Sequence, residues 1–277
     1  MSKKAAVLGF PVDQSLSPLI HQHWLQRYQI DGQYKAINVM PENLAQWVDT
    51  LVRTGYAGFN VTIPHKIGVM AFCDEITPLA QEIGAVNMVT IDERGRLTGT
   101  NTDVFGFQEN LRQQQPGWDP AQGPALVLGA GGAARAVVYA LLEMGVPQVT
   151  LCNRTSDRAA ALAQEDFCRG RVNVLDWAAR DKGLYTSTLL VNTTSLGMVY
   201  SEPLEIDLSN AGCLVYDIVY RPQETPLLQQ ARRYGLPVVT GLGMLLHQAR
   251  PAFAAWFGTM PEIDDALIDK VERAASS

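Results

Sequence analysis

Lys66 is the residue of this sequence that is best suited to acid–base chemistry. It is one of only six lysines in 277 residues, and it follows the strand-like stretch NVTIPH, residues 60–65. An ammonium group in an apolar neighbourhood can donate a proton and stabilise a negative oxygen if a carboxylate balances its charge. Asp103, after GTNT, can supply that carboxylate. The alternatives are that Lys66 is an ordinary exposed lysine, or that His65 is the proton donor, although the sequence shows no partner for it.

Polar side chains also stand where the predicted strands of the first hundred residues end. Asn60 and Thr62 alternate with Val61 and Ile63, so we expect one apolar face in the core and an amide and a hydroxyl on the other. Comparable residues near other strand ends are Ser15, Ser17, Asn87, Asn101 and Asp103. Ligands of open α/β sheets bind beyond the carboxyl ends of the strands, so these groups predict a site for a substrate with many hydroxyl groups. The alternative is that each is a turn or capping residue.

A glycine-rich turn in the second half of the chain predicts a dinucleotide site. Gly129, Gly131 and Ala134 form the pattern G-x-G-x-x-A between the apolar run ALVL and a long helical pattern. The first glycine allows a tight turn, the second lets the backbone approach a pyrophosphate, and the alanine lets helix and strand pack closely. This context favours a cofactor site over an ordinary strand–helix turn.

The residues after the next predicted strand indicate which dinucleotide binds. QVTLCN is followed by Arg154 and Thr155, at the place where an NAD-binding domain usually has an acidic residue for the ribose. An arginine can instead pair with the 2′-phosphate of NADP, and Arg158 one helical turn later can add a second charge. The sequence therefore favours NADP, the alternative being that Arg154 is a solvated loop residue.

Strand-like and helical patterns alternate along both halves of the chain. This alternation predicts βαβ units, mostly parallel sheets and an α/β fold with two domains. Ser17 is suited to be a helix N-cap with Pro18 as the first helical residue, Pro41 likewise opens a helix, and a third helical stretch ends near Ile83. ERGR, residues 93–96, predicts a turn, and RQQQPGWDPAQGP, residues 112–124, predicts a surface connection between the domains.

Composition excludes several classes of protein. A net charge of -6 argues against a general binder of nucleic acid or of anionic membranes, and no apolar run is long enough to span a bilayer. The apolar run after the first residues is too short for a signal peptide. The four cysteines show no CxxC spacing and the histidines are dispersed, so we expect no metal site, free thiols, a cytoplasmic protein and a small-molecule partner.

Segments along nearly the whole chain resemble the shikimate dehydrogenase family. They are GFPVDQSLSP, GFNVTIPHK, GAVN, GTNTD, GAGGAARA, NRT, TTSLGM, DIVYRPQETPLL and GLGMLLHQA. The resemblance implies reversible NADPH-dependent reduction of 3-dehydroshikimate to shikimate, within chorismate and aromatic amino acid biosynthesis. It also implies a substrate-binding and catalytic domain of residues 1–104 plus 241–277, a Rossmann-type NADP-binding domain of residues 105–240, and a cleft between them. Helices starting at Asp103 and near Leu242 would connect the domains. A monomer and a homodimer both stay open.

The resemblance also assigns roles to single residues. The catalytic residues would be Lys66 and Asp103. The substrate-binding residues would be Ser15, Ser17, Asn60, Thr62, Asn87, Tyr220 and Gln248. The cofactor-binding residues would be Gly129, Ala130, Gly131, Gly132, Ala133, Asn153, Arg154, Thr155, Arg158, Ile218 and Gly241. Ile218 would lie beside the nicotinamide, where relatives often have methionine.

Two positions depart from the family's pattern. Met88 follows GAVN where threonine is common, and Pro78 stands where relatives often have a polar residue. They leave open a branch that also uses quinate or an aminoshikimate, or a quinate/shikimate dehydrogenase using either cofactor, which Arg154 disfavours. A nucleotide-dependent regulator without turnover is a further alternative, and the presence of Lys66 and Asp103 argues against it.

Overall fold

The computed structural model of the chain describes residues 2–276, which divide into two compact units. Unit 1 comprises the residues up to Asp103 together with Leu246–Val271. Unit 2 comprises Val104–Leu245 and the residues from Glu272 on. Among the described residues, no helix has the length and apolar character needed to cross a membrane.

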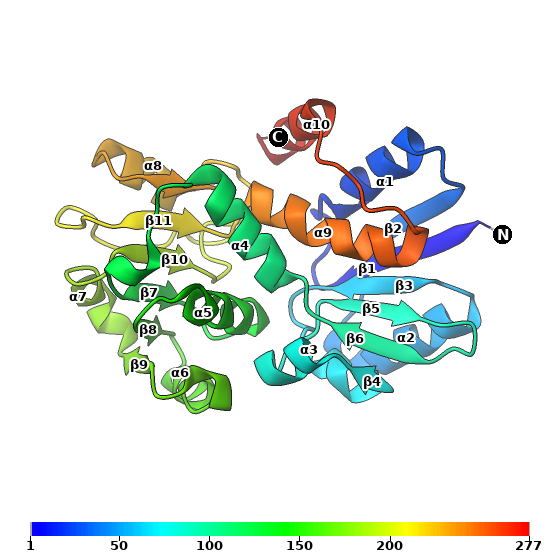
Figure 1. The fold of residues 1–277 in the computed structure, drawn as a ribbon, viewed down its shortest axis with the longest axis horizontal. Helices are drawn as coiled ribbons and strands as arrows, with labels where there is room; N and C mark the ends of the chain where they lie inside the picture. Colours follow the sequence, from blue (N-terminus) through cyan, green and yellow to red (C-terminus); the bar gives the residue numbers. More distant parts are fainter. Residues whose placement is uncertain (1, 277) are drawn as a thin grey trace. The chain divides into compact units, whose positions relative to one another are not determined.

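Unit 1 is built on a six-stranded mixed sheet with the order β2-β1-β3-β5-β6-β4 (Figure 1). The strands are β1 Lys3–Gly9, β2 Gly32–Asn38, β3 Gly58–Val61, β4 Glu75–Ile76, β5 Met88–Ile91 and β6 Leu97–Thr100. β1 is parallel to β2 and β3, β4 is parallel to β6, and only β5 is antiparallel to its neighbours. The predicted mostly parallel sheet is therefore confirmed. The expected turn at ERGR lies between β5 and β6, where the carboxylate of Asp92 accepts hydrogen bonds from the backbone of Arg94 and Arg96.

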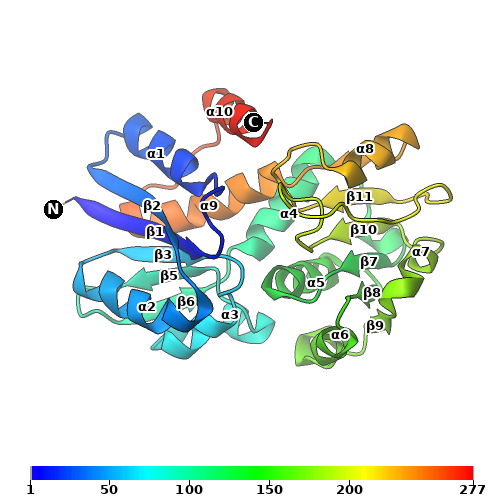
Figure 2. The same cartoon turned by 180° about the vertical axis from the view of Figure 1, so that it is seen from behind.

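Helices cover both faces of this sheet (Figures 1 and 2). The elements are α1 Ser17–Arg27, η1 Pro41–Asn43, α2 Leu44–Arg53, η2 Gly68–Phe72, α3 Pro78–Ile83, α9 Leu242–Phe257 and α10 Asp265–Ser276. Leu44, Val48 and Leu51 recur at helical spacing, so α2 buries one apolar face against Phe59 and Val61 of β3. On the other face, Trp24 of α1 packs against Phe253 of α9, with the two ring centroids 5.4 Å apart.

Two details of unit 1 differ from expectation. α1 begins at Ser17 itself and its N-cap is Leu16, because the Ser17 amide already bonds back to the hydroxyl of Ser15. β3 ends at Val61, so the expectation that Ile63 lies in the core is wrong: 53% of Ile63 is exposed. The chain turns there, since the His65 amide bonds to the Thr62 carbonyl.

Unit 2 contains a six-stranded sheet that is parallel throughout, with the order β12-β11-β10-β7-β8-β9. The strands are β7 Ala125–Leu128, β8 Val149–Cys152, β9 Val172–Leu175, β10 Leu189–Asn192, β11 Leu214–Asp217 and β12 Val238–Val239. β7, β10 and β11 are fully buried, as expected for strands covered on both faces. Counted from β7, this is the strand order of the doubly wound Rossmann fold, which confirms the predicted fold class.

The helices of unit 2 lie on the two faces of its sheet (Figures 1 and 2). They are α4 Asp103–Gln114, η3 Pro120–Gln122, α5 Gly132–Met144, α6 Ser156–Ala163, η4 Asp166–Cys168, η5 Trp177–Ala179, α7 Arg180–Gly183 and α8 Pro226–Arg233. Leu227 and Leu228 of α8 pack with Leu190 and Val215 on one face. On the other face, Phe107 of α4 stacks on Tyr216 of β11 with the centroids 4.7 Å apart.

The surface connection expected at residues 112–124 is wrong as a link between domains. Residues 112–114 are the last turn of α4, and the whole stretch lies inside unit 2. The glutamines are held there by backbone partners: Gln114 Nε2 donates to the Thr240 carbonyl and Gln115 Nε2 to the Val238 carbonyl. The chain passes between the units at the start of α4 and within the first turn of α9, at Leu245–Leu246.

Candidate active site

Lys66 and Asp103 form an ion pair in a hydrogen-bonded polar cluster of unit 1. The other members of the cluster are Asn60, Asn87, Thr102 and Gln248. The Lys66 Nζ atom lies 2.6 Å from Asp103 Oδ2, and the two side chains are only 14% and 6% exposed. Lys66 follows the turn after β3, and Asp103 is the first residue of α4, where the helix dipole favours a negative charge. The structure thus brings together the two residues that the sequence singled out for chemistry, and each charge compensates the other in a poorly solvated place.

Asn87, just before β5, fixes the second oxygen of Asp103. Asn87 Nδ2 donates to Asp103 Oδ1 over 2.8 Å, and Asn87 Oδ1 accepts a hydrogen bond of 2.7 Å from the backbone of Thr102. The Asp103 amide in turn donates to Asn101 Oδ1 over 2.9 Å. Because both oxygens and the backbone of Asp103 are engaged, the carboxylate can hold only one orientation toward Lys66.

Gln248 of α9 reaches the same cluster from a distant part of the sequence. Its Oε1 atom lies 3.4 Å from Asn87 Nδ2 and 3.4 Å from the Thr102 hydroxyl. Thr102 is 5% exposed and belongs to the cluster, although the sequence analysis passed over it. Its only signal was its place in the polar run GTNTD, beside a proposed catalytic residue.

Asn60 joins the cluster through the backbone of Asn87, to which its Nδ2 atom donates over 3.0 Å. Its Oδ1 atom accepts a hydrogen bond of 2.7 Å from the hydroxyl of Tyr34, a residue of β2 that the sequence analysis did not select. Tyr34 therefore determines which way the Asn60 amide points. A tyrosine in the strand pattern YKAINV carries no signal that would separate it from an ordinary core residue.

The other predicted substrate residues lie near the ends of strands but outside this hydrogen-bonded cluster. Thr62 is half-buried at the carboxyl end of β3. Ser15 and Ser17 follow β1, the parallel neighbour of β3, and the Ser15 hydroxyl accepts from the Ser17 amide over 3.3 Å. Tyr220 belongs to unit 2, unlike the rest of the predicted substrate set.

His65 has a structural role that disfavours it as a proton donor. It is 2% exposed, and its Nε2 atom lies 2.7 Å from the carbonyl oxygen of Val39. A carbonyl oxygen only accepts hydrogen bonds, so Nε2 carries a hydrogen and donates a hydrogen bond to Val39, the residue that follows β2. This contact gives His65 a structural role between β3 and the end of β2.

The glycine turn of unit 2 has the properties of a phosphate site. Gly129 has φ +112°, and a Cβ atom there would lie 2.4 Å from the Thr193 hydroxyl, so the fold itself requires glycine. Gly131 differs, because its φ is -90° and a Cβ atom there would meet nothing within 4 Å. The packing of the protein does not explain this glycine. α5 begins here without a side-chain cap or an acidic residue in its first turn, so its N-terminus is suited to an anion.

The other predicted residues of the turn are arranged as the motif requires. Gly132 is the first residue of α5, Ala133 follows it, and Ala134 is completely buried where the helix meets the sheet. Ala130 is 9% exposed at the turn. The backbone amides at the start of α5 therefore stay accessible to an anion while the helix packs tightly on β7.

The two predicted phosphate-binding arginines follow β8, next to the glycine turn. β8 is the parallel neighbour of β7, and the Gly129 amide donates to the Cys152 carbonyl over 2.8 Å. Arg154 and Arg158 are exposed, and within residues 2–276 no ion pair involves either of them. Asn153 supports the loop by donating to the Thr155 carbonyl over 2.8 Å. The structure thus holds two unpaired cations beside a helix N-terminus, which suits a phosphorylated ribose.

Gly241 and Ile218 are neighbours at the carboxyl end of β11. A Cβ atom at Gly241 would lie 2.4 Å from the Ile218 carbonyl oxygen, so close packing accounts for this glycine without a ligand. The Ile218 amide donates to the Asn192 carbonyl over 3.1 Å, which continues the sheet by one residue.

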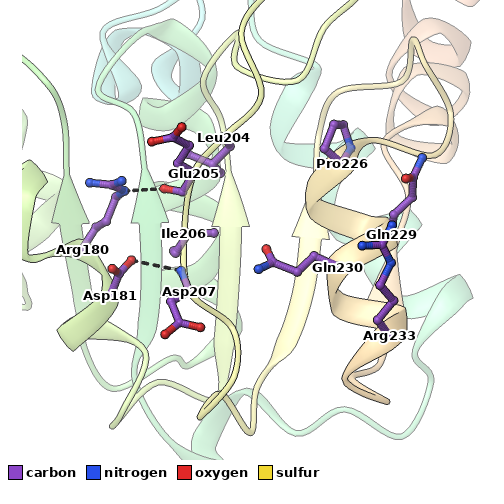
Figure 3. Close-up of a pocket in the computed structure, with 10 residues that line it drawn as sticks. All are labelled: Arg180, Asp181, Leu204, Glu205, Ile206, Asp207, Pro226, Gln229, Gln230 and Arg233. Atoms are coloured by element: carbon purple, nitrogen blue, oxygen red, sulfur yellow. Dashed lines mark hydrogen bonds between the residues drawn. The ribbon is translucent and has the colours of Figure 1, made fainter.

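A surface depression of about 630 Å³ in unit 2 contains none of the predicted site residues (Figure 3). Its lining mixes Arg180 and Arg233 with Asp181, Glu205 and Asp207. Arg180 Nε donates to the Glu205 carbonyl, and Asp181 accepts from the Asp207 amide, so the side chains of Arg180 and Asp181 hold the backbone of the segment that crosses the depression (Figure 3). We therefore locate the chemistry in the hydrogen-bonded cluster of unit 1 and not in this depression.

The cysteines offer no competing nucleophile. All four thiols are free, and burial raises the pKa of Cys73, Cys152, Cys168 and Cys213 to about 11. A thiol with such a pKa stays protonated near neutral pH and is a poor nucleophile.

Comparison with known proteins identifies the family of the chain. Family models match the shikimate dehydrogenase substrate binding domain over residues 7–89, shikimate / quinate 5-dehydrogenase over 111–195, and the shikimate 5′-dehydrogenase C-terminal domain over 241–267. The NADP(+) shikimate dehydrogenase of Paramagnetospirillum magneticum is 51% identical over 268 residues, which are 96% of each chain.

Solved structures show the same architecture. The shikimate 5-dehydrogenase of Thermus thermophilus, in complex with NADP(H) and shikimate, has a TM-score of 0.83 at 39% identity, covering 99% of each chain. The quinate dehydrogenase of Corynebacterium glutamicum, in complex with NAD, has a TM-score of 0.87 at 29% identity, covering 99% of this chain and 98% of that one. The resemblance in the sequence motifs is confirmed, and the chain belongs to the shikimate dehydrogenase family.

Proposed function

We propose that this protein is an NADP-dependent shikimate dehydrogenase, which reversibly reduces 3-dehydroshikimate to shikimate in the synthesis of chorismate and aromatic amino acids. The observation that carries the proposal is the nearly buried Lys66–Asp103 pair. It places a proton donor inside a cluster of amides and hydroxyls suited to a hydroxylated ring.

The reaction needs a proton at the carbonyl oxygen as well as a hydride at its carbon. NADPH supplies the hydride when it is bound. Lys66 Nζ stabilises the oxygen as negative charge develops on it and then gives it the proton, so that the ketone becomes an alcohol and the lysine a neutral amine. Asp103 holds Lys66 in place, and solvent returns the proton to the lysine. The reverse steps oxidise shikimate.

The remaining groups of unit 1 orient the substrate. The hydroxyls of Ser15 and Ser17 anchor the substrate carboxylate, and the amides of Asn60, Asn87 and Gln248 hold ring hydroxyls. The contact with Tyr34 occupies Asn60 Oδ1, and the contact with Asn87 occupies one hydrogen of Asn60 Nδ2. Asn60 therefore has its second Nδ2 hydrogen to offer, and it donates to a ring oxygen. We also propose Tyr220, in the segment after β11, as a substrate-binding residue.

The nucleotide binds to unit 2. When it is bound, the N-terminus of α5 and Gly131 would hold its pyrophosphate, and Arg154 and Arg158 would pair with its 2′-phosphate. Ile218 would lie beside the nicotinamide. The absence of an acidic residue at the end of β8 leaves NAD without a partner for its 2′-hydroxyl, so NADP is the preferred cofactor.

A direct test measures the near-ultraviolet absorbance of NADPH formed by the purified protein. Shikimate, quinate and an aminoshikimate are each supplied with NADP and, separately, with NAD. We expect the largest kcat/KM for shikimate with NADP. Activity with quinate and NAD but not with shikimate and NADP would refute the proposal and favour a quinate dehydrogenase.

The state of the four cysteines bears on the compartment in which the protein works. Four free thiols suit the reducing cytoplasm, and we propose that the protein works there. We propose a monomer or a homodimer in solution, and light scattering of the purified protein distinguishes the two.

A further inference from the structure

A completely buried carboxylate in unit 2 has no place in the chemistry described so far. Asp217, the last residue of β11, is 0% exposed. In the part of the chain that the structure describes, no cation pairs with it. Buried aspartates without a cation are uncommon, because desolvation of the charge costs free energy unless hydrogen bonds offset it.

Three hydrogen bonds compensate Asp217, one from the end of β10 and two from the segment between β11 and α8. Its Oδ1 atom accepts from Asn192 Nδ2 over 2.9 Å and from the Val219 amide over 3.0 Å. Its Oδ2 atom accepts from the Thr225 hydroxyl over 2.7 Å. Val219 and Thr225 stand near the two ends of the segment between β11 and α8, so one carboxylate fastens both ends of that loop.

The partners of Asp217 extend the network on each side. Asn192 ends β10, and its amide also donates to the Leu196 carbonyl, while its Oδ1 atom accepts from the backbone and hydroxyl of Thr194. Thr225 is the N-cap of α8 and accepts from the Leu228 amide over 3.3 Å. Asp217 thereby locks the residues after β10, the residues after β11 and the start of α8 into one arrangement.

We propose that Asp217 is a positioning residue, which holds residues 218–225 in the conformation that presents Ile218 to the nicotinamide and Tyr220 to the substrate. This inference rests on the proposed function, because those two roles belong to it. Burial raises the pKa of Asp217 to about 6, which agrees with a carboxylate kept in an unfavourable environment for its hydrogen bonds.

The decisive variants change single hydrogen bonds of the network. Asp217→Asn keeps an Oδ1 acceptor for Asn192 and Val219, but its amide donates to Thr225 instead of accepting from it. Thr225→Val removes the hydroxyl and keeps the shape of the side chain. Both loosen the far end of the loop. We expect each variant to lower kcat and to raise KM for shikimate. In each variant kcat/KM should fall about tenfold or more, which is the usual scale for losing a hydrogen bond to a charged group.

Affinity for NADP is the readout that separates positioning from general damage. The glycine turn and Arg154 follow β7 and β8, whereas residues 218–225 follow β11, so the dissociation constant of NADP should change less than kcat/KM for shikimate does, any change reflecting the Ile218 contact. Thr225→Ser keeps the hydroxyl and should restore most of the lost kcat/KM. Leu208→Ala is the matched stability control: Leu208 is 0% exposed in the core of unit 2, so this variant should lower Tm while each folded molecule keeps normal kcat and KM.

Amide hydrogen exchange tests the inference without substrate. Thr225→Val should speed exchange of the amides in residues 218–225 and leave β8 and β9 unchanged, whereas Leu208→Ala should not act on that loop selectively. Unchanged loop exchange and normal kcat/KM per folded molecule in both Asp217→Asn and Thr225→Val would overturn the inference. The wild-type protein is assayed alongside: if it fails to oxidise shikimate, the proposed function fails, and loop exchange alone then decides the role of Asp217.

Discussion

The polar cluster of unit 1 and the nucleotide-binding turn of unit 2 treat their charges in opposite ways. Lys66 and Asp103 are nearly buried and neutralise each other; Lys66 binds one carboxylate oxygen of Asp103, and the Asn87 amide donates to the other. Arg154 and Arg158 are exposed, and no ion pair of theirs occurs in the described part of the chain. Arg135, close by in α5, is instead paired with Glu165 over 2.7 Å. The charges of the unit 1 cluster are therefore compensated within the protein, whereas the charges of Arg154 and Arg158 are left to solvent in the described residues.

The chemistry of the two ligands explains this difference. A hydroxylated ring presents hydrogen-bonding groups and one carboxylate, so the site must already hold its own charges in register for proton transfer. A 2′-phosphate brings negative charge, and exposed arginines can exchange water for charge-assisted hydrogen bonds with little desolvation cost. Removing a charge should therefore impair turnover in unit 1 and the affinity for NADP in unit 2.

The largest effect should follow Lys66→Ala. The variant loses both the proton donor and the cation that stabilises the developing oxyanion, so kcat should fall about 10³-fold or more, while KM changes much less. Steady-state kinetics and thermal unfolding are measured on the same sample. A variant with a much lower Tm but nearly normal turnover per folded molecule would assign Lys66 a purely structural role as the partner of Asp103.

The next largest effect should follow Arg154→Ala. KM for NADP should rise about tenfold or more, because a charge-assisted phosphate contact is worth roughly 1.5–3 kcal/mol. KM for NAD and kcat should change little, and Arg158→Ala should act in the same direction. Arg233→Ala, at another exposed arginine of unit 2, is the control. Equal losses with NADP and NAD would remove the 2′-phosphate assignment.

The two glycines of the turn offer a sharper version of the comparison. Gly131→Ala adds a methyl group where no protein atom lies within 4 Å, so Tm should stay close to that of the wild type while the methyl group meets the pyrophosphate. NADP affinity measured by calorimetry should fall several-fold. Gly129→Ala should instead lower Tm, since φ is +112° and the methyl group collides with Thr193. Loss of Tm in Gly131→Ala without loss of affinity would contradict a ligand role.

The dependence of stability on pH extends the comparison, because one buried residue in each unit acts in an opposite sense. His21 is completely buried against Tyr34, and burial lowers its pKa from 6.5 to about 3. The unfolded chain therefore binds more protons between pH 3 and 6.5, and the stability contributed by neutral His21 is lost as pH falls through that window. Burial raises the pKa of Asp217 from 3.8 to about 6, so between pH 4 and 6 the folded chain binds more protons and stability falls as pH rises.

Two variants separate these contributions. His21→Phe keeps the ring stacked on Tyr34 and removes the titrating group, so the loss of stability toward acid should become shallower, by up to about 1.4 kcal/mol per pH unit. Asp217→Asn should make the loss of stability toward acid steeper between pH 4 and 6, because the stability that protonation of Asp217 adds as pH falls disappears. Denaturant unfolding at several pH values measures both slopes. Identical slopes in His21→Phe and the wild type would show that burial does not hold His21 neutral.

Much of the candidate site followed from local sequence. Lys66 after a strand, Asp103 at a helix start and the glycine turn between ALVL and α5 are each recognisable within about ten residues, and the structure has them where the pattern indicated. Boundaries were less secure: β3 stops at Val61, and α4 extends to Gln114. β3 stops where the chain turns, since the His65 amide bonds to the Thr62 carbonyl, whereas the last turn of α4 is held by a distant residue, since the Gln114 side chain donates to the Thr240 carbonyl.

The sequence by itself determined the α/β alternation, the Rossmann-type turn and the residue types that can move a proton and bind a phosphate. The alternation and the turn follow from hydrophobic period and turn chemistry, which depend on near neighbours along the chain. The capacity to move a proton or bind a phosphate follows from the residue type itself. Tertiary structure alone decided that Gln248 meets Asn87, that Tyr34 orients Asn60, and that Asp217 fastens a loop through Asn192 and Thr225. Those contacts join residues on different strands and helices. Their partners are chosen by how the sheets pair and the helices pack, because a buried polar group takes its hydrogen bond from whichever group the packing brings within reach.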